Sequence, residues 1–170
     1  HAFGGKSEFE IAAAQCLAGL GHAGFAADIY GNGKRAGSRD EAFALMNALD
    51  GNRPELLRRL RATVDCMAGL PQVDAGRLAA IGFCFGGKCA LDLARGNAGL
   101  RSVVSFHGVY DAPPASGPSP IDASVLVLHG WEDPLATPEQ LIVLAEELTA
   151  RRADWQVQAF GHTGHAFTHP

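Results

Sequence analysis

The chain has 170 residues, 47% of them apolar and 19% charged, and a formal net charge of −4. This length and composition predict one soluble globular domain over residues 1–170, large enough for a hydrophobic core. The slightly acidic balance, without a basic stripe, argues against a nucleic-acid partner. No apolar run approaches membrane-spanning length, which argues against a membrane protein.

The first residues, HAFGGKSEFE, lack the pattern of a signal peptide and do not begin with Met. They indicate a trimmed chain or a piece of a longer one. The four cysteines match no zinc or redox-pair spacing. Since they predict no disulfide framework, the reducing cytoplasm is the expected location.

Helix start signals recur along the first half. Ser7 and Glu10 form a capping box, Ser38 repeats this signature, and Pro54 suits the first turn of a helix. The predicted helices span residues 8–20, 39–51 and 54–69. Residues 24–30 (GFAADIY) are expected to form a short buried strand, and the arginines at 58, 59 and 61 a solvated stripe without a function.

The second half alternates apolar runs with helical patterns. Strands are predicted at residues 78–82, 102–106, 124–128 and 155–160, and helices at 87–95 and 138–151. The first run does not alternate, which suits a strand covered on both faces. This order predicts an α/β fold with a mostly parallel sheet. In such sheets, sites form beyond the carboxyl ends of the strands.

One such end carries Gly82-Phe83-Cys84-Phe85-Gly86. Glycines two residues before and after a nucleophile permit a very tight turn from strand to helix. At the helix N-terminus, the dipole and backbone N–H groups favour a thiolate, and the N–H of Phe85 could hold an oxyanion. The alternative is a cysteine that serves as a small buried packing residue.

An acid and a base candidate follow later strands. Asp133 is the acid candidate, although it also fits a turn before Pro, and Glu132 competes with it. His165 is the base candidate, with rivals at His162 and His169. The order nucleophile, acid, histidine is that of α/β-hydrolases, and it favours a Cys84-Asp133-His165 triad. The other histidines form no metal site by spacing, and no cofactor is expected.

The chain also resembles the dienelactone hydrolase family of α/β-hydrolases. The matching segments are HAFGG at 1–5, ADIYG at 27–31, AAIGFCFGGKCALDLA at 79–94, SFHGVYD at 105–111, VLHGWEDP at 127–134 and GHAFTHP at 164–170. The resemblance implies a three-layer α/β-hydrolase sandwich and the Cys84-Asp133-His165 triad. It implies hydrolysis of esters or lactones through a thioester, of the carboxymethylenebutenolidase type.

The chain departs from the family at two substrate-contacting positions. His1 stands where the family has a glutamate that contacts the resting cysteine, and His169 where the prototype has a substrate-binding arginine. Both changes argue against dienelactone itself as the substrate. The N–H of Ala2 would be the second oxyanion donor, and Phe3, Phe83 and Trp131 are expected to wall the substrate pocket.

The family has strands before the HAFGG segment, including a central one, that this chain lacks. A fragment, strand exchange with a second chain, or direct pairing of the neighbouring strands would each account for the gap, and the exposed edge favours a homo-oligomer. The expected ligand is a small ester or lactone. The alternatives are a thiol acyltransferase, an inactive truncated fold that serves as an interaction module, and a redox-sensing cysteine.

Overall fold

The computed structural model describes residues 1–114 and 116–168, and its chain divides into two compact units, residues 1–75 and 76–170. Each unit is described by itself. Among the described residues, no helix has both the length and the apolar character needed to cross a bilayer. All four cysteines carry free thiols.

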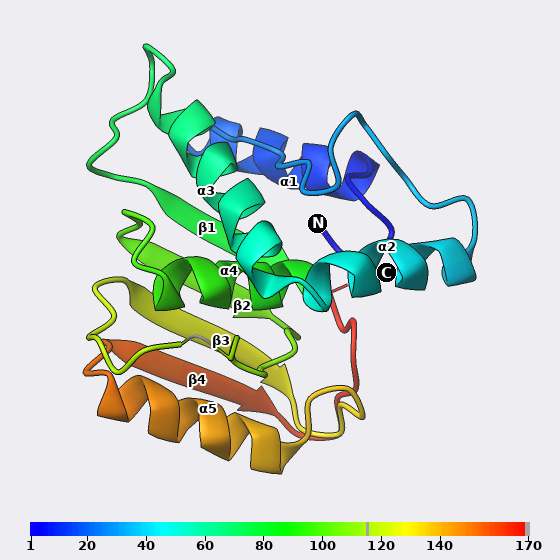
Figure 1. Ribbon diagram of the computed structural model, residues 1–170, viewed down its shortest axis with the longest axis vertical. Helices are drawn as coiled ribbons and strands as arrows, with labels where there is room; N and C mark the ends of the chain where they lie inside the picture. Colours follow the sequence, from blue (N-terminus) through cyan, green and yellow to red (C-terminus); the bar gives the residue numbers. More distant parts are fainter. Residues whose placement is uncertain (115, 169–170) are drawn as a thin grey trace. The chain divides into compact units, whose positions relative to one another are not determined.

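The first unit contains the three expected helices, α1 (Glu8–Gly19), α2 (Arg39–Asp50) and α3 (Arg53–Ala68) (Figure 1). Each begins where its start signal predicted. Ser7 and Glu10 form a complete capping box, Ser38 caps α2, and the Asn52 side chain accepts a hydrogen bond at the start of α3. Local capping chemistry therefore determines these boundaries.

The strand predicted at residues 24–30 is wrong, because this segment is irregular. Its backbone groups bond to side chains instead of to a neighbouring strand. The Ile29 N–H donates to His1 Nε2 at 3.1 Å, and Arg59 Nη1 donates to the carbonyls of Ile29 and Tyr30 at 3.1 and 2.8 Å. Arg59 thus anchors residues 29 and 30. The prediction that this arginine belongs to a solvated stripe without a function is therefore wrong.

The second unit is a parallel α/β structure, as predicted. Its strands are β1 (Ala79–Phe83), β2 (Ser102–Phe106), β3 (Ser124–Gly130) and β4 (Trp155–Phe160), in the order β1-β2-β3-β4 and all paired in parallel. Helix α4 (Phe85–Arg95) connects β1 to β2, and α5 (Pro138–Ala150) connects β3 to β4. Figure 1 shows both helices in front of the sheet.

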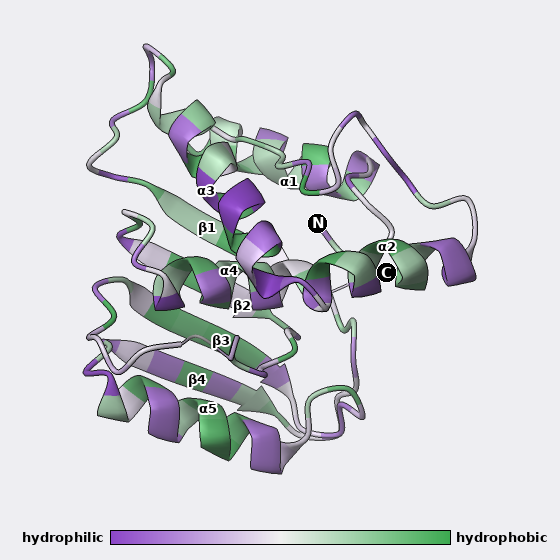
Figure 2. Ribbon diagram, viewed as in Figure 1, coloured by the Kyte–Doolittle hydropathy of each residue, from purple (hydrophilic) through white to green (hydrophobic). Residues whose placement is uncertain are grey.

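The core of this unit lies between the sheet and these two helices. Alternate residues of β2 and β3 are buried, among them Val103, Val125 and Val127. Figure 2 shows β3 as mostly apolar, whereas polar and apolar residues alternate along β4. The buried guanidinium of Arg95 on α4 pairs with Glu147 on α5, with Nη2 and Oε2 2.7 Å apart.

Strand β1 departs from one expectation. It was predicted to be covered on both faces, but Ala79 is exposed and Ile81 is 39% exposed. The reason is that β1 is the edge strand of this four-stranded sheet. Its carboxyl end is buried, and Phe83 is in register with Phe106 of β2, which is in register with Leu128 of β3. The loops after the strands therefore start at one edge of the sheet.

Candidate active site

Cys84 occupies a sharp turn between β1 and α4. Its φ and ψ of 56° and −116° are strained for a residue with a side chain. Backbone hydrogen bonds hold the turn, because the Cys84 N–H donates to the Phe106 carbonyl at 3.0 Å and the Cys84 carbonyl accepts from the Gly87 N–H at 2.9 Å. The half-buried thiol thus lies at the N-terminus of an 11-residue helix.

Glycine is necessary where the turn closes on itself. A Cβ on Gly82 would collide with the backbone carbonyl of Gly86. This is the crowding that the Gly-x-Cys-x-Gly spacing predicted. Gly87 is equally confined, because a Cβ there would lie 2.7 Å from Ser105 Oγ and 2.8 Å from Gly108 Cα. The first turn of α4 therefore packs closely against the loop after β2.

Asp133 lies in the loop after β3 and is 2% exposed. Its Oδ1 accepts a hydrogen bond from the Leu135 N–H at 2.8 Å, and its Oδ2 contacts His165 Nδ1 at 2.7 Å. Two different donors therefore fix both carboxylate oxygens. A carboxylate held in this way orients an imidazole and favours its Nδ1-protonated state.

His165 reaches Asp133 because the loops after β3 and β4 lie close together. The Glu132 N–H donates to the Thr163 carbonyl at 2.9 Å. Gly130 permits this approach, since a Cβ there would lie 2.5 Å from the Gly164 carbonyl oxygen and 2.6 Å from that of Thr163. Gly130 at the end of β3 thus allows the loop that carries His165 to pack against the loop that carries Asp133.

The surroundings of His165 raise its pKa to about 9. The largest cause is an interaction with the Cys84 thiol, and the bond to Asp133 adds to it, whereas burial acts in the opposite direction. The Nε2 atom of His165 is buried and makes no well-formed hydrogen bond among the described residues.

The rival residues, Glu132 and His162, bond to each other. His162 Nδ1 lies 3.1 Å from Glu132 Oε1, and these side chains are 98% and 60% exposed. A pair this exposed is a surface contact of little energetic weight. His169, the third histidine considered as a base and a substrate-binding candidate, lies outside the described residues.

Two buried histidines of this region were given no role by the sequence interpretation. His107 is buried, and its ring contacts that of His165 at a centroid distance of 5.1 Å. His129 is also buried, its Nδ1 lies 2.9 Å from the Tyr110 hydroxyl, and burial lowers its pKa while the charge of Asp133 opposes this effect. The available signal was that both histidines stand at carboxyl ends of strands.

The expected pocket residues of this unit have different environments. Phe83 is buried and stacks on Phe106 with a centroid distance of 4.8 Å. Trp131 is 48% exposed and follows β3 directly. Phe85, the expected oxyanion donor, is the first residue of α4. Their contact with a substrate remains a prediction.

The remaining expected residues belong to the first unit. The buried His1 ring accepts from the Ile29 N–H through Nε2, and its Nδ1 lies 2.7 Å from the Ala2 carbonyl oxygen. The Ala2 N–H donates to Glu10 Oε1 at 3.2 Å. Phe3 contacts Phe43 with a centroid distance of 5.2 Å. These bonds give His1 and Ala2 defined structural partners within the unit.

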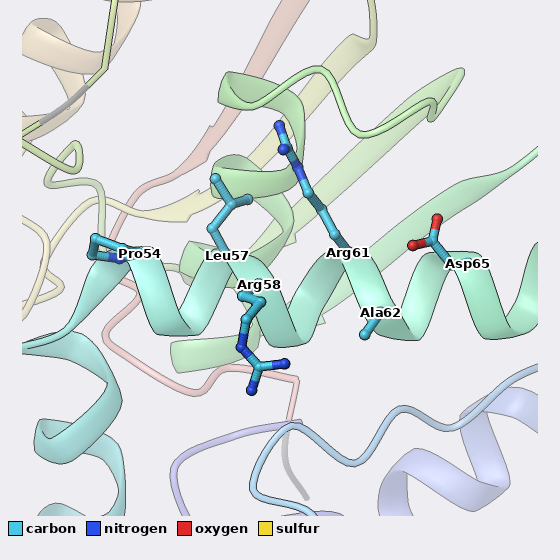
Figure 3. Close-up of a pocket in the computed structure, with 6 residues that line it drawn as sticks. All are labelled: Pro54, Leu57, Arg58, Arg61, Ala62 and Asp65. Atoms are coloured by element: carbon cyan, nitrogen blue, oxygen red, sulfur yellow. The ribbon is translucent and has the colours of Figure 1, made fainter.

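A separate depression lies on helix α3 (Figure 3). It is lined by Pro54, Leu57, Arg58, Arg61, Ala62 and Asp65, with a volume of about 480 Å³. No candidate catalytic residue contributes to it. Among the described residues, no group of three or more His, Cys, Asp or Glu side chains could hold a metal ion.

The sequence profile of the dienelactone hydrolase family matches residues 1–170. The chain belongs to this family. Solved structures agree with this membership. A dienelactone hydrolase-like promiscuous phosphotriesterase, P91 from metagenomic libraries, is 36% identical with a TM-score of 0.94, over 99% of this chain and 70% of the other. A structure described as m3DLH is 39% identical, with the same TM-score and the same coverage of both chains.

The chain is also similar to a curated animal protein. An uncharacterized Caenorhabditis elegans protein, K02A2.1, is 37% identical over 119 residues, which is 68% of this chain and 75% of the relative. The comparisons thus establish the family and its α/β fold.

Proposed function

We propose that this chain hydrolyses activated carboxylic esters or lactones, with Cys84 as the nucleophile, His165 as the base and Asp133 as its orienting acid. One observation carries the proposal: His165 bonds to Asp133 at 2.7 Å, while the Cys84 thiol is the largest cause of its raised pKa. A histidine coupled to both a thiol and a buried carboxylate is the arrangement that activates a cysteine.

In the resting site His165, whose pKa is raised to about 9, holds its proton as an imidazolium beside the Cys84 thiolate, and in the first half-reaction this thiolate attacks the carbonyl carbon. The oxyanion that forms would accept a hydrogen bond from the N–H of Phe85 at the start of α4. The tetrahedral intermediate collapses, its carbon–oxygen bond breaks, and the leaving alkoxide takes the proton from His165. An acyl group is now bound to Cys84 as a thioester.

In the second half-reaction, His165 takes a proton from water, and the hydroxide attacks the thioester. The thiolate leaves and the carboxylic acid is released, so one water is consumed for each ester. A thiolate leaves a tetrahedral intermediate more easily than an alkoxide, which favours activated esters and strained lactones as substrates.

The proposal is tested by mixing the protein with p-nitrophenyl acetate, quenching with acid after brief times, and measuring intact mass with peptide mapping. A transient acetyl group on Cys84 that decays as acetate forms is expected. Cys84→Ala should lose the adduct and lower kcat/KM by at least about 10³-fold. Cys89→Ala, which removes the buried thiol of the same helix, is the matched control and should retain both.

The other outcomes separate the alternatives. Transfer of the acyl group to added alcohols or thiols in preference to water would identify an acyltransferase. An unmodified Cys84 and p-nitrophenol release at the buffer rate would overturn the proposal and favour an inactive fold that binds a partner. Unchanged turnover by Cys84→Ala would refute the cysteine mechanism.

A second activity is suggested by the likeness to P91, which is described as a promiscuous phosphotriesterase. The same thiolate could attack phosphorus, expel an aryloxide and leave a phosphoryl group on Cys84 until water removes it. Paraoxon tests this activity: a diethylphosphoryl adduct on Cys84, with p-nitrophenol release above the buffer rate, would support it. Absence of both would restrict the chain to carboxylic esters.

A further inference from the structure

His107 is a buried histidine beside the proposed catalytic base, and the chemistry described above gives it no role. It directly follows β2 and has a φ of 39°, a left-handed conformation that residues with side chains seldom adopt. Its N–H donates to the Leu128 carbonyl at 2.9 Å, which binds this strained residue to β3. The surroundings therefore hold the His107 backbone in one place.

The side chain of His107 contacts three residues of one short segment. Its ring meets the ring of His165 at a centroid distance of 5.1 Å and an interplanar angle of 69°. It meets Phe167 at 5.2 Å and 79°, and its Nε2 lies 2.8 Å from Thr168 Oγ1. Two edge-to-face contacts and one hydrogen bond thus hold the segment after β4.

The same stretch of backbone also supports the cysteine. The carbonyl of Phe106, the residue before His107, accepts the hydrogen bond from the Cys84 N–H. The end of β2 therefore contacts the cysteine turn through Phe106 and the histidine segment through His107. A displacement of either Phe106 or His107 would therefore alter the distance between the Cys84 thiol and the His165 imidazole.

We propose that His107 is a positioning residue, which holds the segment 165–168 so that the His165 ring stays between Asp133 and Cys84. This inference rests on the proposed function, because it assigns His107 to the geometry of that site. The groups that face His165 are then Cys84, Asp133 and the His107 ring. A shift of about 1 Å in a catalytic group can lower the rate about 10²-fold, so the effect is measurable.

Three variants separate the contributions of the ring and the hydrogen bond. His107→Phe keeps a ring against His165 but loses the bond to Thr168. His107→Gln retains an amide that can reach Thr168 but loses the ring. Thr168→Val removes the hydroxyl and leaves His107 intact. His162→Ala is the matched control, because His162 lies in the same loop and is 98% exposed.

The first readout is the titration of His165, followed by NMR of protein with ¹³C-labelled histidine and assigned through the loss of its signal in His165→Gln. The wild-type midpoint is expected near 9. The three variants should move it towards the ordinary value of 6.5, whereas His162→Ala should leave it unchanged. This readout needs no hydrolysis, so it remains informative if the chain proves inactive.

The second readout is kinetic. With p-nitrophenyl acetate, each variant should lower kcat about 5- to 50-fold while KM changes less than about 3-fold, since positioning acts on the reaction more than on binding. His107→Phe and Thr168→Val should not be additive, because both remove the same hydrogen bond. An unshifted titration midpoint in all folded variants would overturn the proposal. Loss of activity only in proportion to unfolded protein, measured by circular dichroism, would do the same.

Discussion

His165 Nδ1 and Asp133 Oδ2 lie 2.7 Å apart, although the two residues are 32 positions apart in the chain. Their contact arises from the topology, because β3 and β4 are adjacent parallel strands and the two residues lie in the loops that follow them. Gly130 and the bond from Glu132 to Thr163 bring those loops together. Both side chains therefore depend on a rigid sheet for their alignment.

Replacing Asp133 with Asn should impair catalysis while keeping side-chain volume. The carboxylate accepts one N–H through each oxygen, whereas an amide has only one oxygen, so either His165 or the Leu135 N–H would face an NH₂ group. We expect kcat to fall about 10²- to 10⁴-fold and the His165 titration midpoint to drop. Steady-state kinetics and NMR titration measure these effects.

Glu132→Gln is the matched control for this substitution. Glu132 is the neighbouring carboxylate, but it pairs with the exposed His162 on the surface. We expect kcat to stay within about 2-fold of the wild type, because exposed pairs contribute little. A larger loss in Glu132→Gln than in Asp133→Asn would exchange the roles of the two carboxylates.

The raised pKa of His165 predicts how stability depends on pH. The folded-state pKa is about 9 and the ordinary value is 6.5, so folded protein binds the His165 proton more tightly than unfolded protein. The stabilisation that protonated His165 supplies is fully present below about pH 6.5 and is lost as pH rises through about 9. Urea unfolding of wild type and His165→Gln at several pH values isolates this contribution.

The stability difference between these two proteins should shrink between pH 6.5 and 9. Subtracting the variant cancels the contributions of titrating groups away from the site and leaves that of His165 together with Cys84 and Asp133, the two groups coupled to it. A difference that is independent of pH over this window would show that His165 is not held as a cation in the folded protein.

Gly82→Ala should disrupt the cysteine turn. The added Cβ would overlap the backbone of Gly86, which the first turn of α4 cannot move without distortion. We expect a loss of more than about 3 kcal/mol in the free energy of unfolding, or failure to fold, measured by urea denaturation. Gly117→Ala, where a Cβ meets nothing within 4 Å, should change stability by less than about 0.5 kcal/mol. Equal effects of the two substitutions would contradict the crowding argument.

Local sequence signals were sufficient to predict most of the helices and strands. Ser7, Ser38 and Pro54 marked helix starts that the structure contains, and short segments rich in apolar residues marked the four strands of the parallel sheet, although polar residues alternate with apolar ones in β4. The order of Cys84, Asp133 and His165 along these strands also indicated which residues lie at one sheet edge. Each of these inferences needed only short segments and the geometry of parallel strands.

The hydrogen-bond and ion-pair partners of individual groups could not be predicted from local sequence in the same way. Residues 24–30 have the composition of a strand, but their backbone groups bond to His1 and Arg59 instead. The pairing of Glu132 with His162, and of the Ala2 N–H with Glu10, also depends on which groups meet in space. No local pattern encodes such long-range choices.

Gly130→Ala should test the position of the loop that carries His165, because it displaces this loop without changing any of the loop's residues. Its Cβ would lie 2.5 Å from the Gly164 carbonyl oxygen and 2.6 Å from that of Thr163, so the loop must retreat. All proposed catalytic side chains remain, yet His165 should move away from Asp133. We expect kcat to fall about 10²-fold, and the His165 titration midpoint to drop, as measured by kinetics and NMR.

Gly161→Ala is the control for this loop, because a Cβ at Gly161 meets nothing within 4 Å. It should retain wild-type kcat and the wild-type titration midpoint. If Gly130→Ala folds with an unchanged midpoint, the loop tolerates the added methyl group and close packing at Gly130 is not what aligns His165. If the midpoint drops while unfolding remains cooperative, the distance between the two loops controls the coupling between acid and base.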